Sequence, residues 1–168
     1  MKRTAIAAVA LLALVLVGSA IAGGQPVFRL VDKSLTPEFD LTSSTCPNLP
    51  EGTAIHGTGT GKSITTVMID RNGVETIMNT THEFGTATDQ AGNVYVFQYA
   101  NSFRVSGPAN GDLVGLMTDH FSLSGPGPAN LDNGFTAVFN ITQGTLDPIS
   151  SHGDPIDFAT GEELCDPL

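Results

Sequence analysis

Residues 93–106 read NVYVFQYANSFRVS, and this stretch decides the fold. It contains neither Pro nor Gly, and aromatic or β-branched residues recur at every second position over most of its length. Side chains on a β-strand alternate between two faces, so one face collects the apolar set. The inward set is Tyr95, Phe97, Tyr99, Phe103 and Val105, with Gln98, Ser102 and Arg104 on the other face. The period of two predicts one long strand with an apolar inner face.

The flanking segments repeat this alternation and are joined by turn sequences. The runs 70–73 (DRNG) and 89–92 (DQAG) each place Asp first and Gly fourth. That order is typical of a type I turn followed by a bulge in a β-hairpin. Further inward sets are Leu113, Met117, Phe121 and Leu123, and then Phe135, Ala137, Phe139 and Ile141. No segment shows the apolar spacing of a helix, so the sequence predicts an all-β antiparallel meander.

The length of the central strands predicts how the meander is shaped. Residues 74–88 and 93–106 each exceed the typical strand of about 5–6 residues. Strands of that length bend, and bending curls an antiparallel sheet into a barrel. We expect the meander to close into a small barrel, with a two-layer β-sandwich as the alternative.

The N-terminus has the three parts of a secretory signal peptide. Lys2 and Arg3 precede an apolar run at 5–17, and Ala20-Ile21-Ala22 forms a small-residue cleavage site. The alternative is an uncleaved membrane anchor, but the run is shorter than the ~20 residues that a spanning helix needs. We expect residues 1–22 to be removed after Ala22 and the mature protein to be secreted into the extracellular space.

The rest of the chain forms one expected domain in three parts. Residues 23–52 are interpreted as an irregular segment with one strand, 53–143 as the barrel, and 144–168 as a C-terminal strap. Cys46 and Cys165 are the two cysteines, and export to an oxidising compartment favours a disulfide between them. Two free buried thiols are the alternative. The disulfide would tie both ends of the domain together.

Charge and motif patterns exclude several function classes. The formal net charge is −10 at pH 7, so the chain repels nucleic acids and anionic lipid surfaces. We expect no nucleic-acid partner and no stable membrane insertion after signal cleavage. The run 56–63 (HGTGTGKS) resembles a phosphate-binding loop, but His56 stands where that motif needs its first Gly. Close backbone approach in a Gly-Thr strand is the simpler interpretation.

Asp119 is the most informative polar residue. Alternation places it on the same face as Met117 and Phe121, where a carboxylate is costly unless it is paired or hydrogen-bonded. It is therefore either a functional group or a structural plug, and a bulge at Gly115 could also turn it outward. The expected companions in the barrel mouth are His82, Tyr95, Phe97, Tyr99 and Phe103. Plain core packing is the alternative for the aromatic residues.

The histidines predict neither a metal site nor a cofactor. His56, His82, His120 and His152 form no H-x-H or H-E-x-x-H motif. In the adjacent pairs His82-Glu83 and 119–120, the two side chains point to opposite faces of a strand. A metal site would need histidines from different strands, which the sequence alone does not place together.

Several short segments resemble a group of small secreted bacterial proteins of unknown function. They are the runs 46–50 (CPNLP), 79–82 (NTTH), 118–121 (TDHF), 131–135 (LDNGF) and 153–161 (GDPIDFATG). The resemblance covers most of the mature chain and implies no activity and no site residues. The barrel expected here is similar to the allene-oxide-cyclase type by fold analogy only.

These observations predict a secreted binding or interaction module without enzymatic activity. Its partner would be a small apolar ligand held by the aromatic face, or another protein. The first alternative is a cyclase-like or hydrolytic enzyme that uses Asp119 with a histidine or tyrosine. The second is a structural envelope protein without a ligand. Catalytic residues are not assigned by the sequence.

Overall fold

A computed structural model describes residues 26–153, 156–157, 162–163 and 165 of the chain. The predicted signal peptide and its cleavage site lie outside the described residues. Throughout the described part the backbone forms strands, turns, bends or irregular segments, without helix. It therefore contains no helix with the length and apolar character needed to cross a membrane.

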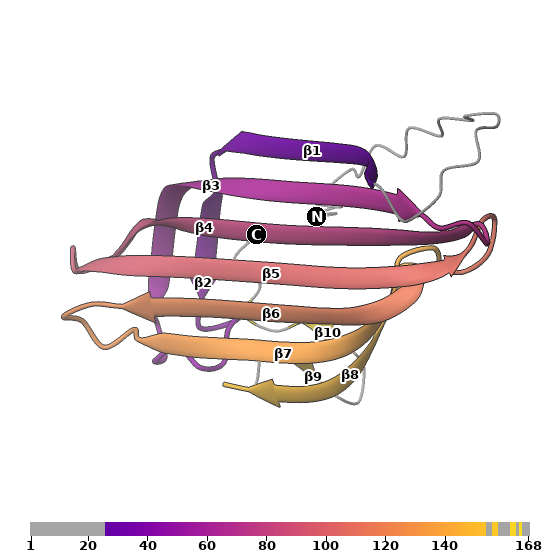
Figure 1. The fold of residues 1–168 in the computed structure, drawn as a ribbon. Coiled ribbons are helices and arrows are strands. Elements are labelled where there is room, and N and C mark those ends of the chain that lie inside the picture. The colour runs from indigo at the N-terminus through magenta and orange to yellow at the C-terminus, as the bar shows by residue number, and fades with distance from the viewer. Residues whose placement is uncertain (1–25, 154–155, 158–161, 164, 166–168) are drawn as a thin grey trace.

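The sheet is an antiparallel meander, as predicted (Figure 1). Its strand order is β1-β3-β4-β5-β6-β7-β8, and β2 pairs with β3 beside β1. A separate two-stranded ribbon consists of β9 and β10. The strands are β1 (Pro26–Leu35), β2 (Glu38–Thr42), β3 (Ala54–Ile69), β4 (Val74–Asp89), β5 (Val94–Pro108), β6 (Val114–Ser124), β7 (Leu131–Asn140), β8 (Thr145–His152), β9 (Ile156–Asp157) and β10 (Glu162–Glu163).

The pairing from β3 to β7 runs without a register shift. Turn chemistry sets this register, because Gly73 (φ 77°) and Gly92 (φ 85°) adopt the left-handed conformation that follows each Asp-led turn. In both turns an Asp carboxylate oxygen accepts backbone N–H groups two and four residues later. Side chains therefore alternate between the two faces without interruption in these five strands, and the inward sets predicted for β5, β6 and β7 are confirmed.

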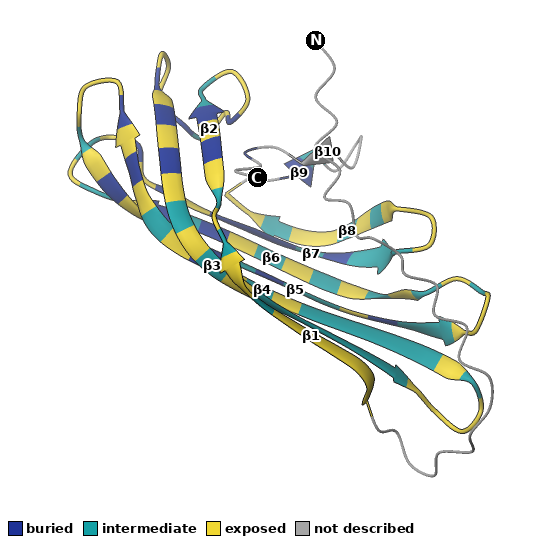
Figure 2. Ribbon diagram, turned by 90° about the horizontal axis from the view of Figure 1, so that it is seen from above, coloured by how far each residue is buried: buried dark blue, intermediate teal, exposed yellow. Residues whose placement is uncertain are grey.

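Barrel closure is the part of the fold prediction that the structure does not support. The path of the sheet ends at β1 and β8, which do not pair with each other in the described part of the chain. Figure 2 shows a sheet that curls strongly near β2 and spreads out toward its other end. On one edge, β1 and β2 share β3 as partner, and the chain between them passes through Pro37, which has no N–H to donate.

Two segments expected to be irregular contribute strands to the sheet. The segment 23–52 contains both β1 and β2, where one strand was predicted. β8 lies within the segment predicted as a strap, and it pairs with β7. The strap therefore begins after His152.

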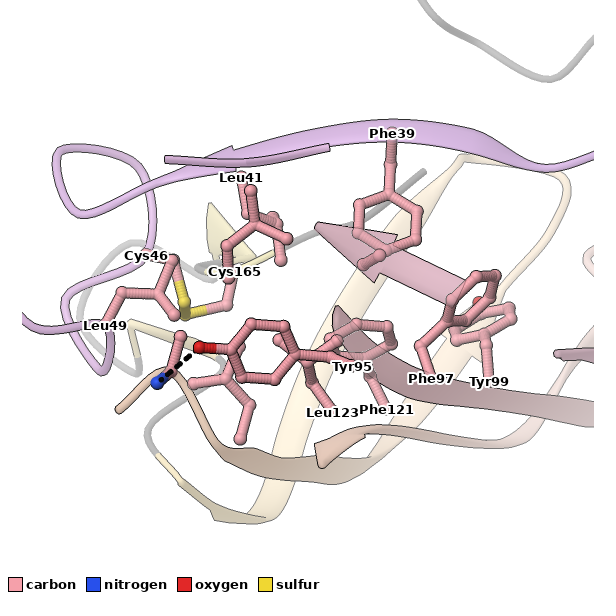
Figure 3. Packing of buried hydrophobic residues seen from close by; sticks show 14 residues of the cluster. Phe39, Leu41, Cys46, Leu49, Tyr95, Phe97, Tyr99, Phe121, Leu123 and Cys165 are labelled. Atoms are coloured by element: carbon pink, nitrogen blue, oxygen red, sulfur yellow. Dashed lines mark hydrogen bonds between the residues drawn. A yellow bond between two sulfur atoms is a disulfide. The ribbon is translucent and has the colours of Figure 1, made fainter. Parts of the chain in front are cut away.

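The closed end is the region where β2 folds over the central strands. Its buried cluster is built around three rings, with Phe39 5.0 Å from Phe97 and 5.7 Å from Phe121 between ring centroids (Figure 3). Gly57 and Gly59 of β3 make room, because a Cβ there would lie 2.3 Å from the Phe39 ring and 2.7 Å from the Phe97 ring. The full cluster comprises Phe39, Leu41, Cys46, Leu49, Ile55, Ala87, Tyr95, Phe97, Tyr99, Phe121, Leu123, Ala129, Leu131 and Cys165.

The predicted disulfide joins Cys46 and Cys165 within this cluster (Figure 3). The two cysteines are 119 residues apart in sequence. A backbone hydrogen bond from Cys165 N to Thr45 O, 3.2 Å long, runs beside the disulfide. A covalent link across a loop of this length restricts the unfolded chain and thereby stabilises the fold.

The open end is the other half of the sheet, which β2 does not cover. Phe103 of β5 and Phe139 of β7 form an edge-to-face pair at 5.5 Å, and both are half-buried. A small cluster of Phe135, Ala137 and Ile156 lies nearby, with Met117 and Leu146 packed against it. At the open end Phe103, Phe139, Met117 and Leu146 are therefore only partly shielded from water, whereas Phe135 and Ala137 are buried.

Candidate functional site

A band of polar side chains crosses the concave face between the closed end and the open end. The register aligns Ser63, Thr81, Asn101 and Asp119 side by side on β3, β4, β5 and β6. All four are inward-facing, because each shares its face with the buried aromatic residues. We call the following set the polar band: Ser63, Thr65, Asn79, Thr81, Glu83, Tyr99, Asn101 and Asp119.

Asp119 points to the inner face, as alternation predicts. β6 pairs without a bulge on both sides, so Gly115 does not rotate the strand. The Tyr99 hydroxyl donates to Asp119 Oδ2 at 2.6 Å, and Asn101 Nδ2 donates to the same oxygen at 2.9 Å. These two bonds satisfy a half-buried carboxylate and hold the Tyr99 hydroxyl in place.

A hydroxyl and amide network occupies the β3–β4 side of the polar band. Asn79 Nδ2 donates to Ser63 Oγ and to Thr65 Oγ1, both at 2.9 Å. Thr81 Oγ1 lies 3.1 Å from both Ser63 Oγ and Asn79 Oδ1, which share its single proton as acceptors. These four half-buried side chains fix one another's rotamers, which keeps a polar surface ordered beneath the open end.

Glu83 is the exceptional member of the polar band. Its residue exposure is 8%, and its Oε2 atom has no hydrogen-bond partner among the residues that the structure describes. Gly61 on the neighbouring strand makes room for it, since a Cβ there would lie 2.6 Å from Glu83 Cγ. Burial raises the pKa of the Glu83 carboxyl above its usual value. A second such buried atom is Asn133 Nδ2 in β7.

The structure brings some of the predicted site residues together and separates others. Tyr99 and Asp119 are in direct contact. Phe103 lies on the same face of β5, two residues further toward the open end than Asn101, the residue that pairs with Asp119. Phe97 belongs to the closed end, where it is fully packed. Tyr95 also belongs there, and its hydroxyl donates to Asp89 Oδ2 at 3.0 Å. His82 is exposed on the convex face, so the structure does not place it with Asp119.

Of the polar band, only Tyr99 and Asp119 are predicted from the sequence as site residues, and Asn101 and Glu83 are missed for different reasons. Asn101 could have been found, because it lies two residues from Tyr99 and two from Phe103 on one strand face. Glu83 was missed because its neighbour His82 was assigned to the inner face. The adjacent Phe84 is 62% exposed, so apolarity gives the wrong face in this part of β4.

Metal-ligating residue types gather on the opposite, convex face. His120, Asp132 and His152 each offer a ligand atom, and these atoms lie within 4.8 Å of one another. The residues come from β6, β7 and β8. The sequence predicts no metal site here because the three positions converge only through the register of three strands.

Comparison of the chain with protein-family models, with curated proteins and with solved structures finds no match.

Proposed function

We propose that the protein is a secreted binding module whose concave face holds a small amphipathic amine. The amine group would contact Glu83, and the apolar part would lie over the open end. The observation that carries this proposal is the buried carboxylate oxygen of Glu83, which lacks a partner among the described residues. The Cys46–Cys165 disulfide is consistent with the oxidising compartment that secretion implies.

The chemistry of the ligand follows from what Glu83 lacks. An ionised carboxylate buried without a hydrogen-bond donor is costly, and natural proteins retain such groups mainly where function needs them. A protonated amine supplies both N–H donors and the opposite charge. The five described Lys and Arg residues are all exposed. By register Arg29, Lys62 and Arg104 lie on the convex face, on the opposite side of the sheet from Glu83.

The apolar part of the ligand follows from the open end. Val67 of β3, Ile77 of β4 and Phe103 of β5 are inward-facing and half-buried, within two register steps of the polar band. Covering half-exposed apolar side chains releases about 25 cal/mol for each Å² removed from water. An alkyl chain of moderate length would gain affinity from this surface while its head group stays at Glu83.

Matched alkyl probes test the proposal by isothermal titration calorimetry below their micelle concentrations. Octylamine, octanol and octanoate each contain eight carbon atoms in an unbranched chain and differ in the terminal polar group. We expect octylamine to bind most tightly and octanoate most weakly, because the polar band carries the carboxylates of Glu83 and Asp119. Equal affinity for octylamine and octanoate would contradict the proposal.

Glu83→Gln is the decisive variant, with Glu38→Gln on an exposed strand position as its control. We expect Glu83→Gln to weaken octylamine binding by roughly tenfold or more, as loss of a buried charge-assisted bond does. Glu38→Gln should leave binding unchanged. If Glu83→Gln binds octylamine as well as the unmodified protein does, Glu83 is not the amine contact.

The same variant has an expected effect on stability without ligand. The folded-state pKa of Glu83 is raised, so the folded protein binds this proton more tightly than the unfolded chain does. The free energy of unfolding that the proton contributes is complete below pH 4.5 and is lost as the pH rises through the folded-state pKa. Glu83→Gln therefore has a higher Tm than the unmodified protein at pH 7, and the difference shrinks toward pH 4. Such a gain in stability with a loss of binding is typical of a functional residue.

An enzymatic function is the second candidate, and the Tyr99–Asp119 contact of 2.6 Å favours it. The histidine version of this proposal loses support, because His82 faces the other side of the sheet. A hydrolytic activity would use Asp119 to polarise the Tyr99 hydroxyl as an acid or base. Turnover of p-nitrophenyl butyrate that disappears in both Tyr99→Phe and Asp119→Asn would favour the enzyme over the binding module.

A further inference from the structure

The convex face carries a second constellation that the proposed ligand site does not use. His120 of β6 pairs with Gly134 of β7, and Gly134 pairs with His152 of β8. The two imidazole rings thus stand on either side of a residue without a side chain, with ring centroids 5.6 Å apart. A Cβ at Gly134 would lie 2.4 Å from His152 Cε1, so the glycine is what allows the rings to approach each other.

Asp132 completes the constellation from the middle strand. It lies two residues before Gly134 and therefore on the same face of β7. Its Oδ1 atom is 2.7 Å from His120 Nε2 and 3.9 Å from His152 Nε2. Asp132 Oδ1 thus faces the Nε2 atom of His120 and the Nε2 atom of His152. The three ligand atoms therefore lie close together on the convex side of the sheet.

We propose that His120, Asp132 and His152 bind a divalent transition-metal ion, with Zn²⁺ as the best fit. Two imidazole nitrogens and one carboxylate oxygen form a donor set that suits Zn²⁺ and excludes Ca²⁺ and Mg²⁺, which prefer oxygen ligands. Around a tetrahedral Zn²⁺ with bonds of about 2.0–2.1 Å, ligand atoms stand about 3.4 Å apart. The distances of 2.7 and 3.9 Å lie on either side of that spacing, so small side-chain rotations are sufficient.

Exposure and charge also favour an exchangeable metal ion at this place. The two histidine side chains are 49% and 57% exposed, so an ion reaches them from solvent and keeps at least one position for water. The formal net charge of −10 raises the local concentration of cations. Three protein ligands with an open position are the pattern of a zinc site that can exchange or accept a further ligand.

His56 of the same sheet also lies beside carboxylates, but its contacts differ in geometry from those of His120, Asp132 and His152. His56 contacts Asp40 Oδ1 through Nδ1 at 3.0 Å and Glu38 Oε1 through Nε2 at 3.9 Å. The two ring nitrogens of one imidazole point in different directions, so these contacts do not converge on a single ion. His56 therefore forms ordinary surface contacts with two carboxylates, and it serves as a matched control for His120.

A bound ion would also connect the edge of the sheet to its interior. β8 pairs with one strand, β7, in the main sheet, whereas His120 belongs to β6, one strand further in. Ligation would link β8 directly to β6 across β7. We therefore expect metal binding to slow hydrogen exchange of the β8 amides more than that of the β4 amides.

The test is titration of the purified full chain, without an affinity tag and after removal of metals with EDTA, with ZnCl₂ by isothermal titration calorimetry. We expect one saturable Zn²⁺ site per chain. At a free Zn²⁺ concentration of 100 times Kd, we expect the Tm to rise by roughly 5–10 °C. CaCl₂ at the same concentration should change neither signal. Absence of saturable Zn²⁺ binding would overturn the proposal.

Single substitutions locate the site. His120→Gln and His152→Gln should each weaken Zn²⁺ binding by roughly tenfold or more, and Asp132→Asn should also weaken it, since each removes a ligand. His56→Gln and His82→Gln should bind Zn²⁺ as the unmodified protein does. Circular dichroism and the Tm in EDTA verify that each variant is folded. Binding that survives both His120→Gln and His152→Gln, in folded proteins, would place the ion elsewhere and overturn the assignment.

Discussion

The closed end and the open end are built from the same strands but differ in how far they are buried. Phe97 and Phe103 both lie on the inner face of β5, yet Phe97 is 1% exposed and Phe103 is half-buried. The difference comes from what lies across the inner face. β2, the loop carrying Cys46 and the loop carrying Ala129 pack over the closed end, whereas at the open end Ile156 of β9 covers Phe135 and Ala137 and leaves Phe103 half-buried. Stability and a binding surface are thus divided between two halves of one sheet.

The largest expected difference between the two ends is the cost of deleting an aromatic side chain. Phe97→Ala should lower the free energy of unfolding by about 3–5 kcal/mol, because it leaves a cavity among close-packed rings. Phe103→Ala should cost less than about 2 kcal/mol, since its ring is already half in water. Urea denaturation followed by circular dichroism measures both. Equal costs would mean that the open end is as well packed as the closed end.

Removal of the disulfide has the next largest expected effect on the difference in stability between the closed end and the open end. Replacing Cys46 and Cys165 together by Ser should cost about 2–5 kcal/mol, mainly through the entropy of the unfolded chain. Hydrogen exchange should increase first at β2, which packs beside the disulfide, and least at the β4–β5 amides of the open end. Uniform acceleration across the sheet would show instead that the disulfide stabilises both ends as one cooperative unit.

The sequence predicted the strands well because their local signals agree. The Asp-led turns at 70–73 and 89–92 fix the hairpin positions, and period-two alternation in residues 93–106 and 113–123 places Tyr99 and Asp119 on the correct side. Barrel closure was not predictable in this way. It depends on whether two edge strands meet, and the path of β1 and β2 along one edge of β3 is a property of the whole sheet.

The sites were less predictable than the strands because they depend on contacts between strands. Glu83 is accommodated by Gly61 on the next strand, while the more apolar Phe84 faces solvent, so hydrophobicity alone misassigns both residues. The convergence of His120 and His152 requires Gly134 between them, which appears only when three strands are in register. A sequence shows which residues share a face of one strand, and it does not show which residues of neighbouring strands stand opposite each other.

The smallest expected effect separates the two similar turns, one at each end. Asp89 at the closed end accepts the same backbone bonds as Asp70 at the open end, and in addition it accepts the Asn93 amide and the Tyr95 hydroxyl through Oδ2. We expect Asp89→Asn to lower the Tm at pH 7 more than Asp70→Asn, because an amide nitrogen at the Oδ2 position accepts neither of these extra bonds. Thermal unfolding of both variants measures the difference.

The pH dependence of the same pair tests the cause. Hydrogen bonds lower the pKa of both carboxyls, with the Asn93 side chain as the largest contribution at Asp89 and the Val74 backbone N–H at Asp70. A lowered pKa means that the stabilisation is complete above the ordinary aspartate value of 3.8 and is lost as the pH falls through the folded-state pKa. The Tm difference between the unmodified protein and Asp89→Asn should therefore be largest near pH 7 and shrink toward pH 3. A difference that stays constant over this range would mean that the charge of Asp89 is unimportant and that the Oδ2 atom holds Tyr95 only as a hydrogen-bond acceptor.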